Sequence, residues 1–247
     1  MKLSKLTSAI ALAAAFVASH ADASVIIGGT RVIYPLADRE VSVKLDNDST
    51  SPSLVQVWVD DGNADAGPGE TKAPFVVTPP IFRMAPQKSQ TLRVIFSGGQ
   101  LPQDRESVYW LNVLDVPPKP TGEAAKANTL QLALRTRIKI FARPDKLEGK
   151  PVDAPAKLTW AVVADPSGNG QALQVTNPTP YFVSFSEFEV QNGNKTFKND
   201  QGGMVAPSGT TVLTVPKMNA VGQGAKVRFT AISDYSAALP GEASIAK

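Results

Sequence analysis

The stretch Ser53-Leu54-Val55-Gln56-Val57-Trp58-Val59 carries valine at every second position from Val55. A period of two is typical of a β-strand with one face packed against a core. The same alternation appears on both sides of this stretch, at Glu40–Leu45 and at Gln90–Phe96, and each run is bounded by Gly, Pro, Asp or Asn. The sequence therefore predicts an all-β protein.

Seven strands are predicted in the first part of the chain. They lie near residues 25–34, 40–47, 53–60, 74–78, 90–97, 106–115 and 128–142. This count, with turns at short intervals, is typical of an immunoglobulin-like β-sandwich. Because the chain has no cysteine, the prediction depends on the strand count and not on a disulfide signature.

A second series of strands follows a break in the pattern. Arg143–Pro155 contains three prolines and no periodic run, which is typical of an interdomain linker. Alternation then resumes near 158–163, 172–175, 182–190, 211–215 and 226–232. The predicted organisation is a first domain at 24–143, a linker at 144–156 and a second, smaller sandwich at 157–247.

The N-terminus resembles a cleaved export signal. Lys2 and Lys5 precede an apolar run at 6–18, and the small residues Ala21 and Ala23 flank Asp22, which is the pattern that signal peptidase recognises. The apolar run is shorter than the roughly 20 residues that a membrane-spanning helix needs. We therefore predict a signal peptide at 1–23.

Loss of this leader limits the chemistry that remains. The single histidine, His20, lies within it, so the predicted mature chain contains neither His nor Cys. Ser-His-Asp and Cys-His nucleophiles, and zinc sites with nitrogen or sulfur ligands, are thereby excluded. A pair of carboxylates for sugar hydrolysis stays possible, although no motif marks one. We predict no enzymatic activity, no metal site and no cofactor.

The charge of the mature chain is nearly balanced. Removing Lys2, Lys5 and Asp22 takes the formal net charge from +3 to +2. Such a balance predicts neither a nucleic-acid partner nor a membrane surface. No later run is apolar and long enough for membrane insertion.

The last strand of the first domain allows two interpretations. Alternation places Leu130, Leu132 and Leu134 on one face and basic residues on the other. The strand could be an ordinary long core strand with one solvated face, which alternation alone favours. It could also be an edge strand that offers its leucines and free backbone groups to another protein.

Several ordered blocks resemble the periplasmic pilus chaperones of the chaperone/usher pathway, the PapD-like family, over essentially the whole mature chain. The blocks are Gly29–Pro35, Thr78–Phe82, Leu101–Ser107, Asn128–Ala133 with Arg137–Lys139 and Arg143–Pro144, Asn177–Tyr181, and Ile232–Tyr235. The segment at 117–127 is short, as in the short-loop branch of the family. The resemblance implies two immunoglobulin-like domains set at an angle around a cleft.

The resemblance also implies a mechanism, in which the chaperone lends a strand to an incomplete pilin subunit. The donor residues would be Leu130, Leu132 and Leu134, and the cleft cations Arg31 and Lys139 would hold the terminal carboxylate of the subunit. An odd number of positions separates Lys139 from Leu130, so strict alternation puts them on opposite faces. Either a bulge intervenes or the lysine enters the cleft while the leucines point elsewhere.

Three further positions match an ion network that ties the two domains of relatives together, namely Glu106, Arg143 and Asp234. We expect this network to set the interdomain angle. The stretch at 60–70 is rich in Gly and Asp but lacks the spacing of a calcium loop, and it is interpreted as a flexible, solvated loop.

The predicted function is a chaperone in the periplasm that binds and folds pilus subunits and delivers them to an outer-membrane usher. An exported structural subunit or adhesin built from the same sandwich is the alternative, and an exported glycosidase is a more distant one. A pilin should have an incomplete final strand, whereas seven strands are predicted here. The residues leave open whether the free protein caps its own edge by forming a dimer.

Overall fold

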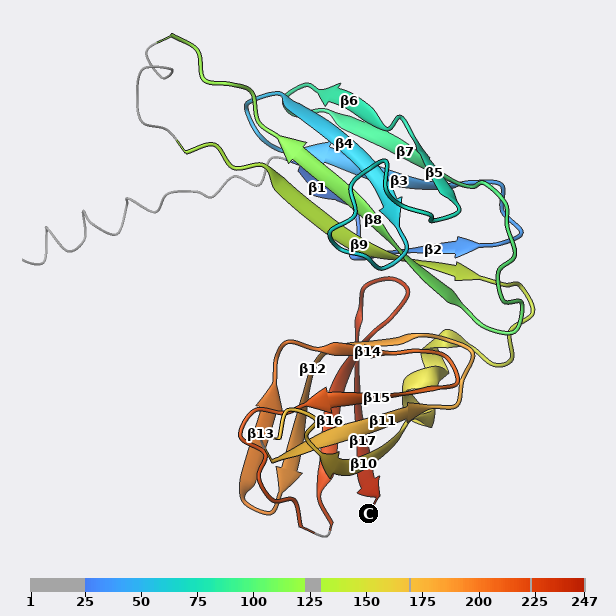
Figure 1. The fold of residues 1–247 in the computed structure, drawn as a ribbon, viewed down its shortest axis with the longest axis vertical. Helices are drawn as coiled ribbons and strands as arrows, with labels where there is room; N and C mark the ends of the chain where they lie inside the picture. Colours follow the sequence, from blue (N-terminus) through green and yellow to red (C-terminus); the bar gives the residue numbers. More distant parts are fainter. Residues whose placement is uncertain (1–24, 123–129, 169, 223, 247) are drawn as a thin grey trace, which may run out of the picture.

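The structure is a computed structural model that describes residues 25–122, 130–168, 170–222 and 224–246. The predicted signal peptide and the first two residues of the predicted donor strand, Asn128 and Thr129, lie outside the described residues. Figure 1 shows two β-sheet bodies, one formed by β1 to β9 and the other by β10 to β17. The all-β, two-sandwich architecture predicted from the alternation is confirmed.

The first sandwich consists of two sheets with a core between them. One sheet has the order β1 (Val25–Ile27), β3 (Val41–Asn47), β7 (Ser89–Phe96) and β5 (Phe75–Thr78). The other has the order β2 (Arg31–Pro35), β9 (Leu134–Arg143), β8 (Ser107–Val116), β4 (Ser53–Asp60) and β6 (Ile81–Met84). Val55, Val57 and Val59 of β4 are buried in this core, as their spacing predicts.

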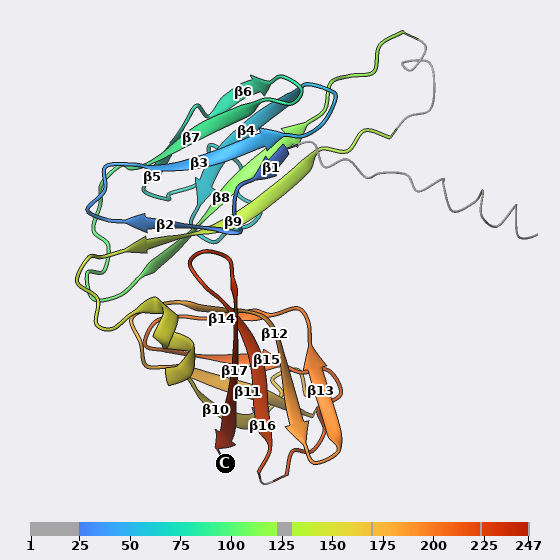
Figure 2. The ribbon, with the colours of Figure 1, turned by 180° about the vertical axis from the view of Figure 1, so that it is seen from behind.

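The prediction of seven strands in this domain was too low. The run at 25–34 is two strands, because the chain leaves the pairing of β1 with β3 after Ile27 and joins β9 from Arg31. The view from behind shows β1 beside β3 and β2 beside β9 (Figure 2). A short strand, β6, also pairs with β4. Gly28 and Gly29 separate β1 from β2, and the apolar pattern of the run conceals this change of sheet.

The predicted strand at 128–142 also needs correction. Strand β9 begins at Leu134, so Leu130 and Leu132 precede it, in a stretch with no regular structure. The register of β9 against β8 is continuous from Leu134 to Ala142. No bulge therefore lies within the part of β9 that pairs with β8.

The strands of the second body form one continuous sheet that folds over its own core, as a sandwich does. Its order is β13-β12-β16-β17-β10-β11-β15, with β14 paired to β12. Its strands have these bounds: β10 (Thr159–Ala164), β11 (Gln171–Asn177), β12 (Val183–Asn192), β13 (Lys195–Asn199), β14 (Gly203–Val205), β15 (Gly209–Thr214), β16 (Lys226–Ile232) and β17 (Ala238–Ala246). Trp160, stacked against Phe229, is buried at the centre of its core.

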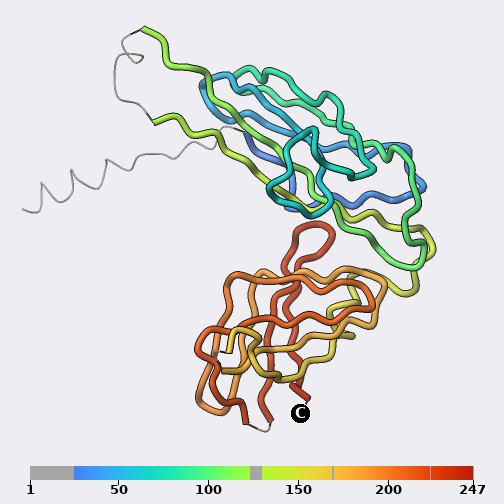
Figure 3. The backbone as a smooth tube through the Cα atoms, viewed as in Figure 1, coloured from blue at the N-terminus to red at the C-terminus, as the bar shows by residue number. Residues whose placement is uncertain are grey.

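The segment predicted to be a linker is partly ordered on the second domain. It contains a 3-10 helix, η2 (Pro151–Lys157), whose Ala154 is buried in the second core. Leu147 packs against the same core. The tube in Figure 3 shows that the chain passes between the bodies once, and that the loop between β16 and β17 rises towards the first body. This loop reaches the sheet that contains β2 and β9.

Candidate binding site

Strand β9 has one side that is only partly paired. It pairs with β8 over Leu134–Ala142, whereas β2 covers its other side only from Lys139 to Arg143. The backbone of residues 134–138 therefore faces an open edge on the β2 side within the described residues. Open edges of this kind can accept an additional strand from another chain.

The open edge ends at two cations. Arg31 is the first residue of β2 and lies opposite Lys139 in the parallel register of β2 and β9. Because Val32 and Ile140, the next pair, are buried in the core, alternation directs Arg31 and Lys139 to the outer face of the sheet. The structure thus brings together the two residues predicted to bind a carboxylate.

Among the described residues, no carboxylate forms an ion pair with either cation. Arg31 donates one hydrogen bond, from Nη1 to the carbonyl oxygen of Ile232 at 2.9 Å, and its buried Nε has no partner among the described residues. Its guanidinium lies 5.5 Å from the centroid of the Phe141 ring. In the described part of the chain, the side chain of Lys139 forms no hydrogen bond or ion pair.

Burial and like charge both act on this pair. Burial lowers the pKa of Lys139 from its ordinary value, and the positive charges of Arg31 and Arg137 lower it further. Burial also lowers the pKa of Arg31, in spite of the opposing effect of Asp234 and Glu106. Arg31 nevertheless stays charged at neutral pH, because the guanidinium group is a very strong base. Two adjacent, half-buried cations form a region of positive potential that favours an anion.

The three predicted network residues meet at the domain interface. The Nε of Arg143 donates to Glu106 Oε1 at 2.6 Å, and its two terminal nitrogens donate to the carboxylate oxygens of Asp234 at 2.7 and 2.9 Å. Glu106 Oε2 accepts a hydrogen bond from the amide of Phe182 at 2.7 Å. Arg143 and Glu106 belong to the first domain, whereas Asp234 and Phe182 belong to the second. The network therefore combines an ion pair within the first domain, between Arg143 and Glu106, with contacts across the interface to Asp234 and to the Phe182 amide.

Two of the network residues, Glu106 and Arg143, have shifted pKa values. Burial raises the pKa of Glu106 above its ordinary value and outweighs the attraction of Arg143. Burial alone would lower the pKa of Arg143, but hydrogen bonds to Asp234 and the charge and hydrogen bond of Glu106 raise it. Arg143 thus stays charged while it engages the nearest carboxylates. Those carboxylates are consequently not free to neutralise Arg31.

Further interface contacts were not predicted from the sequence. Thr30 Oγ1 and Ser236 Oγ are 2.7 Å apart, and the rings of Phe141 and Phe182 are 5.6 Å apart. A pocket between the domains is lined by Arg31, Phe141, Arg143, Phe182, Ile232 and Asp234. The block Ile232–Tyr235 was the only signal that pointed to this loop. Its contacts with Thr30 and Arg31, about two hundred residues away in sequence, were found only in the structure.

The three candidate donor leucines are exposed. Their exposed fractions are 84% for Leu130, 62% for Leu132 and 48% for Leu134. Leu134 is an even number of positions from the core residues Ile138 and Ile140, so it lies on the same face of β9 as they do. Lys139 lies on the opposite face. Of the two explanations for the odd spacing, the structure favours the one in which lysine and leucine face different ways.

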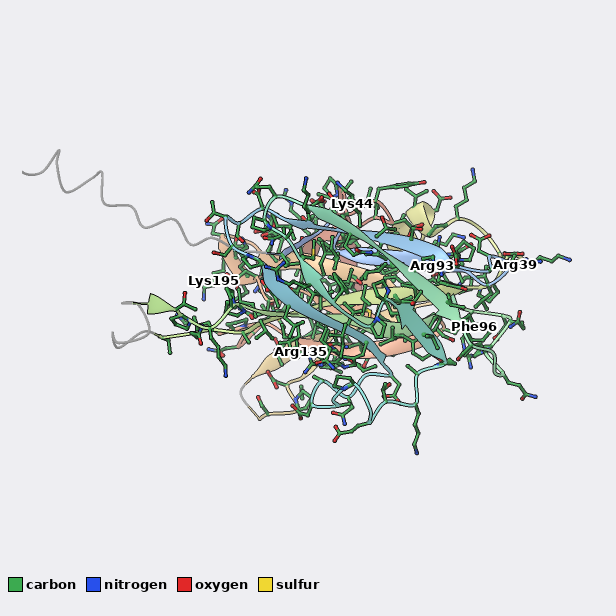
Figure 4. The ribbon with its side chains drawn as sticks, turned by 90° about the horizontal axis from the view of Figure 1, so that it is seen from above. Arg39, Lys44, Arg93, Phe96, Arg135 and Lys195 are labelled. Carbon is green, nitrogen blue, oxygen red and sulfur yellow. The ribbon has the colours of Figure 1, made fainter. Side chains whose placement is uncertain are left out.

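The loop after Asp60 is exposed at most of its positions, as expected of a solvated loop, but it is also attached to the sheet. Ala66 is buried, and its carbonyl oxygen accepts a hydrogen bond from Trp58 Nε1 at 3.2 Å. Arg135 Nη1 donates to the carbonyl oxygen of Ala64 at 2.7 Å. Figure 4 labels Arg135 beside this loop, on the outer face of the sheet. The loop is fastened over β9 and β4 by backbone contacts that a composition of Gly and Asp does not reveal.

Two features are absent from the part of the chain that the structure describes. No helix there has the length and apolarity to cross a bilayer. No group of His, Cys, Asp and Glu there could hold a metal ion.

Two family matches span almost the whole described chain. Residues 24–148 match the family described as "Pili and flagellar-assembly chaperone, PapD N-terminal domain", and residues 153–243 match "Pili assembly chaperone PapD, C-terminal domain". These matches account for both sandwiches.

Individual relatives are similar over their full length. The probable fimbrial chaperone YadV of Escherichia coli K12 is 44% identical over 92% of both chains. Its crystal structure superposes with a TM-score of 0.77, covering 90% of this chain and 99% of that one. The chaperone protein FimB/FhaD of Bordetella pertussis is 45% identical over 96% of this chain and 95% of its own. The SafB chaperone of Salmonella enterica, solved in complex with the SafA pilin, is 29% identical, with a TM-score of 0.72 and coverage of 90% and 96%.

Proposed function

The chain belongs to the PapD-like family of pilus-assembly chaperones, and on that premise we propose that it captures pilus subunits by adding β9 and the leucines before it to an incomplete subunit. Members of this family act by binding and not by catalysis, so the glycosidase alternative is set aside. The names of the relatives as fimbrial chaperones likewise favour a chaperone over a structural subunit or adhesin.

The observation that carries the proposal is the open edge of β9, which stops at Arg31 and Lys139. A strand from a subunit can hydrogen-bond to β9 only as far as the first residue of β2. If the subunit strand ends there with its carboxylate on the two cations, it must run in the same direction as β9. The bound strand would therefore be parallel to β9, with its C-terminus at the cleft.

The leucines supply the apolar part of the interaction. Burying one leucine side chain is worth roughly 1.5 to 3 kcal/mol before the cost of ordering the segment. Leu130 and Leu132 lie outside the regular strand of the free protein, so subunit capture would order them. Arg31 can bind a carboxylate through two parallel hydrogen bonds, and Lys139 adds a compact charge.

A substitution in the donor segment tests the proposal. Leu132→Glu places a charge where an apolar groove must close, so copurification with a coexpressed pilus subunit should be abolished. The folded protein should be unaffected because Leu132 is exposed. Val76→Glu is the matched control, since Val76 is 52% exposed on β5, an edge strand of the other sheet. Normal copurification with Leu132→Glu would refute donor-strand capture.

The site of action follows from the same family. We propose that residues 1–23 direct export and are removed, that the mature chaperone works in the periplasm, and that it delivers subunits to an outer-membrane usher. In this proposal residues 24–143 and 157–247 are the two working domains and 144–156 connects them. In the absence of a subunit, a second copy of the chain is a candidate to cover the open edge. Sequencing the N-terminus of the mature protein tests the leader.

A further inference from the structure

The outer face of β9 carries a row of three cations, of which one is unpaired. Arg135, Arg137 and Lys139 alternate with inward-facing residues along the strand. Arg135 donates from Nε and Nη2 to Asn112 Oδ1, at 2.9 and 2.7 Å, and lies over the Trp58 ring. Arg137 has an ion partner in Asp60. Only Lys139 lacks a partner among the described members of the row.

Asp60 is a completely buried carboxylate, with an exposed fraction of 0%. Its Oδ2 accepts from Arg137 Nε and from Asn112 Nδ2, both at 2.8 Å, and its Oδ1 accepts from Arg137 Nη2 at 2.5 Å and from the Gly62 amide at 2.8 Å. Burial opposes ionisation, yet these hydrogen bonds lower the pKa of Asp60 below its ordinary value. Asp60 is therefore ionised at neutral pH and cancels the charge of Arg137.

The order of the strands shows on which side of β9 the contact between Asp60 and Arg137 lies. The strands are arranged β2-β9-β8-β4, with Arg31 on β2 and Asp60 on β4. Asp60 thus draws Arg137 across β8, where its guanidinium lies 4.5 Å from the centroid of the Trp110 ring. Arg31 and the open edge lie on the opposite side of β9. Positions 137 and 139 are separated by roughly 7 Å along a strand, a distance that a free arginine side chain can span.

We propose that Asp60 is a positioning residue for carboxylate binding: it holds Arg137 against Trp110, on the side of β9 away from the open edge, and so leaves the carboxylate of the bound strand to Lys139 and Arg31. This inference rests on the proposed function, because it presupposes that the cleft binds a terminal carboxylate. It assigns a role in the site to a residue that contacts neither the cleft nor the donor leucines.

The test uses a synthetic peptide of alternating valine and threonine, prepared with a free C-terminal carboxylate and as the C-terminal amide. The wild-type protein should bind the acid at least about tenfold more tightly than the amide, as expected for a charge-assisted contact. Lys139→Gln should lose most of that preference. If the wild-type protein does not distinguish acid from amide, the carboxylate anchor of the proposed function fails, and the inference about Asp60 fails with it.

The decisive variant is Asp60→Asn combined with Lys139→Gln. Released Arg137 should replace the missing lysine and restore binding of the acid by at least about threefold over Lys139→Gln alone. Adding Arg137→Gln should abolish the restoration. If Asp60 only stabilises the fold, the double variant binds no better than Lys139→Gln. That outcome, with an intact wild-type preference, overturns the inference while the proposed function stands.

A second measurement needs no variant and covers the case in which Asp60→Asn fails to fold. The side-chain NMR signals of wild-type Lys139, Arg31 and Arg137 are followed while the acid peptide is added. Signals of Lys139 and Arg31 should shift and those of Arg137 should stay in place. A shift of Arg137 Nε as large as that of Arg31 would show that Arg137 also contacts the carboxylate.

Discussion

At the scale of single residues, the site is distinguished by which charges are paired. Arg143 forms ion pairs with Glu106 and Asp234, and Arg137 forms an ion pair with Asp60. Neither arginine therefore has positive charge to spare for the cleft, because Arg143 contacts two carboxylates and Arg137 contacts one. Arg31 and Lys139 are neighbours of the same sign whose mutual repulsion would be relieved by a bound anion. In the proposed function, these two cations are the groups that the carboxylate of a subunit would neutralise.

Removing both cations tests this account of the anchor. Arg31→Ala combined with Lys139→Ala should reduce subunit capture at least about tenfold, since charge-assisted hydrogen bonds are worth roughly 1.5 to 3 kcal/mol. Capture is measured as the amount of coexpressed subunit that copurifies. Lys44→Ala with Arg93→Ala is the control, because these cations lie on the outer face of the other sheet. Undiminished capture by the cleft variant would remove the carboxylate anchor.

At the scale of elements, the alternation at 40–60 and 90–97 was enough to predict the core strands, but not where strands change partners. A run such as 25–34 shows which faces are apolar, whereas the change from β3 to β9 depends on a backbone turn at Gly28 and Gly29. Strand β17 was missed because Ala238–Ala246 is rich in Ala, Gly and Pro. Its partners β16 and β10 impose the extended conformation.

The same distinction applies to the site. Resemblance identified Arg31, Lys139, Glu106, Arg143 and Asp234. Asp60 was not identified, because a carboxylate at the end of a strand has no signature of its own in a single sequence. Its contacts with Asn112 on β8 and with Arg135 and Arg137 on β9 form only after β4, β8 and β9 pair.

The open edge of β9 predicts a specific pattern of hydrogen exchange. Backbone amides alternate in direction along a strand, so between Leu134 and Ile138 some point towards β8 and the others towards the open side. In the free protein the second set should exchange rapidly, and after subunit capture it should become protected because an added strand accepts its hydrogen bonds. NMR-detected exchange measures both states. If protection of these amides is the same with and without subunit, no strand has been added at this edge.

At the scale of the whole molecule, the two domains are joined by a single chain crossing and by contacts of two segments of the second domain: the loop between β16 and β17, and residues 180–182 before β12. Arg143 connects three parts of this interface, since it binds Glu106 and Asp234 and lies 5.4 Å from the centroid of the Tyr181 ring. An ion network of this kind is weak evidence for stability but can fix a geometry. We therefore expect it to set the angle between the domains, and with it the distance from the open edge to the second domain.

Arg143→Ala should loosen the interdomain angle, which small-angle X-ray scattering would detect as a broader distribution of interatomic distances. It should also lower the free energy of unfolding at neutral pH by roughly 3 kcal/mol, because it leaves Glu106 buried without a cation.

The pKa of Glu106 is already raised by burial and should rise further in the variant. The stability that protonated Glu106 contributes is fully present below 4.5, the pKa of the group in the unfolded chain. It is lost as the pH rises through the higher pKa of Glu106 in the folded protein. The deficit of the variant relative to wild type should thus shrink as the pH falls towards 4.5. Arg105→Ala, which breaks only an exposed contact with Asp104 at 3.8 Å, should change neither property. If the loss of unfolding free energy does not depend on pH, its cause is the lost packing against Tyr181 and not the unpaired charge of Glu106.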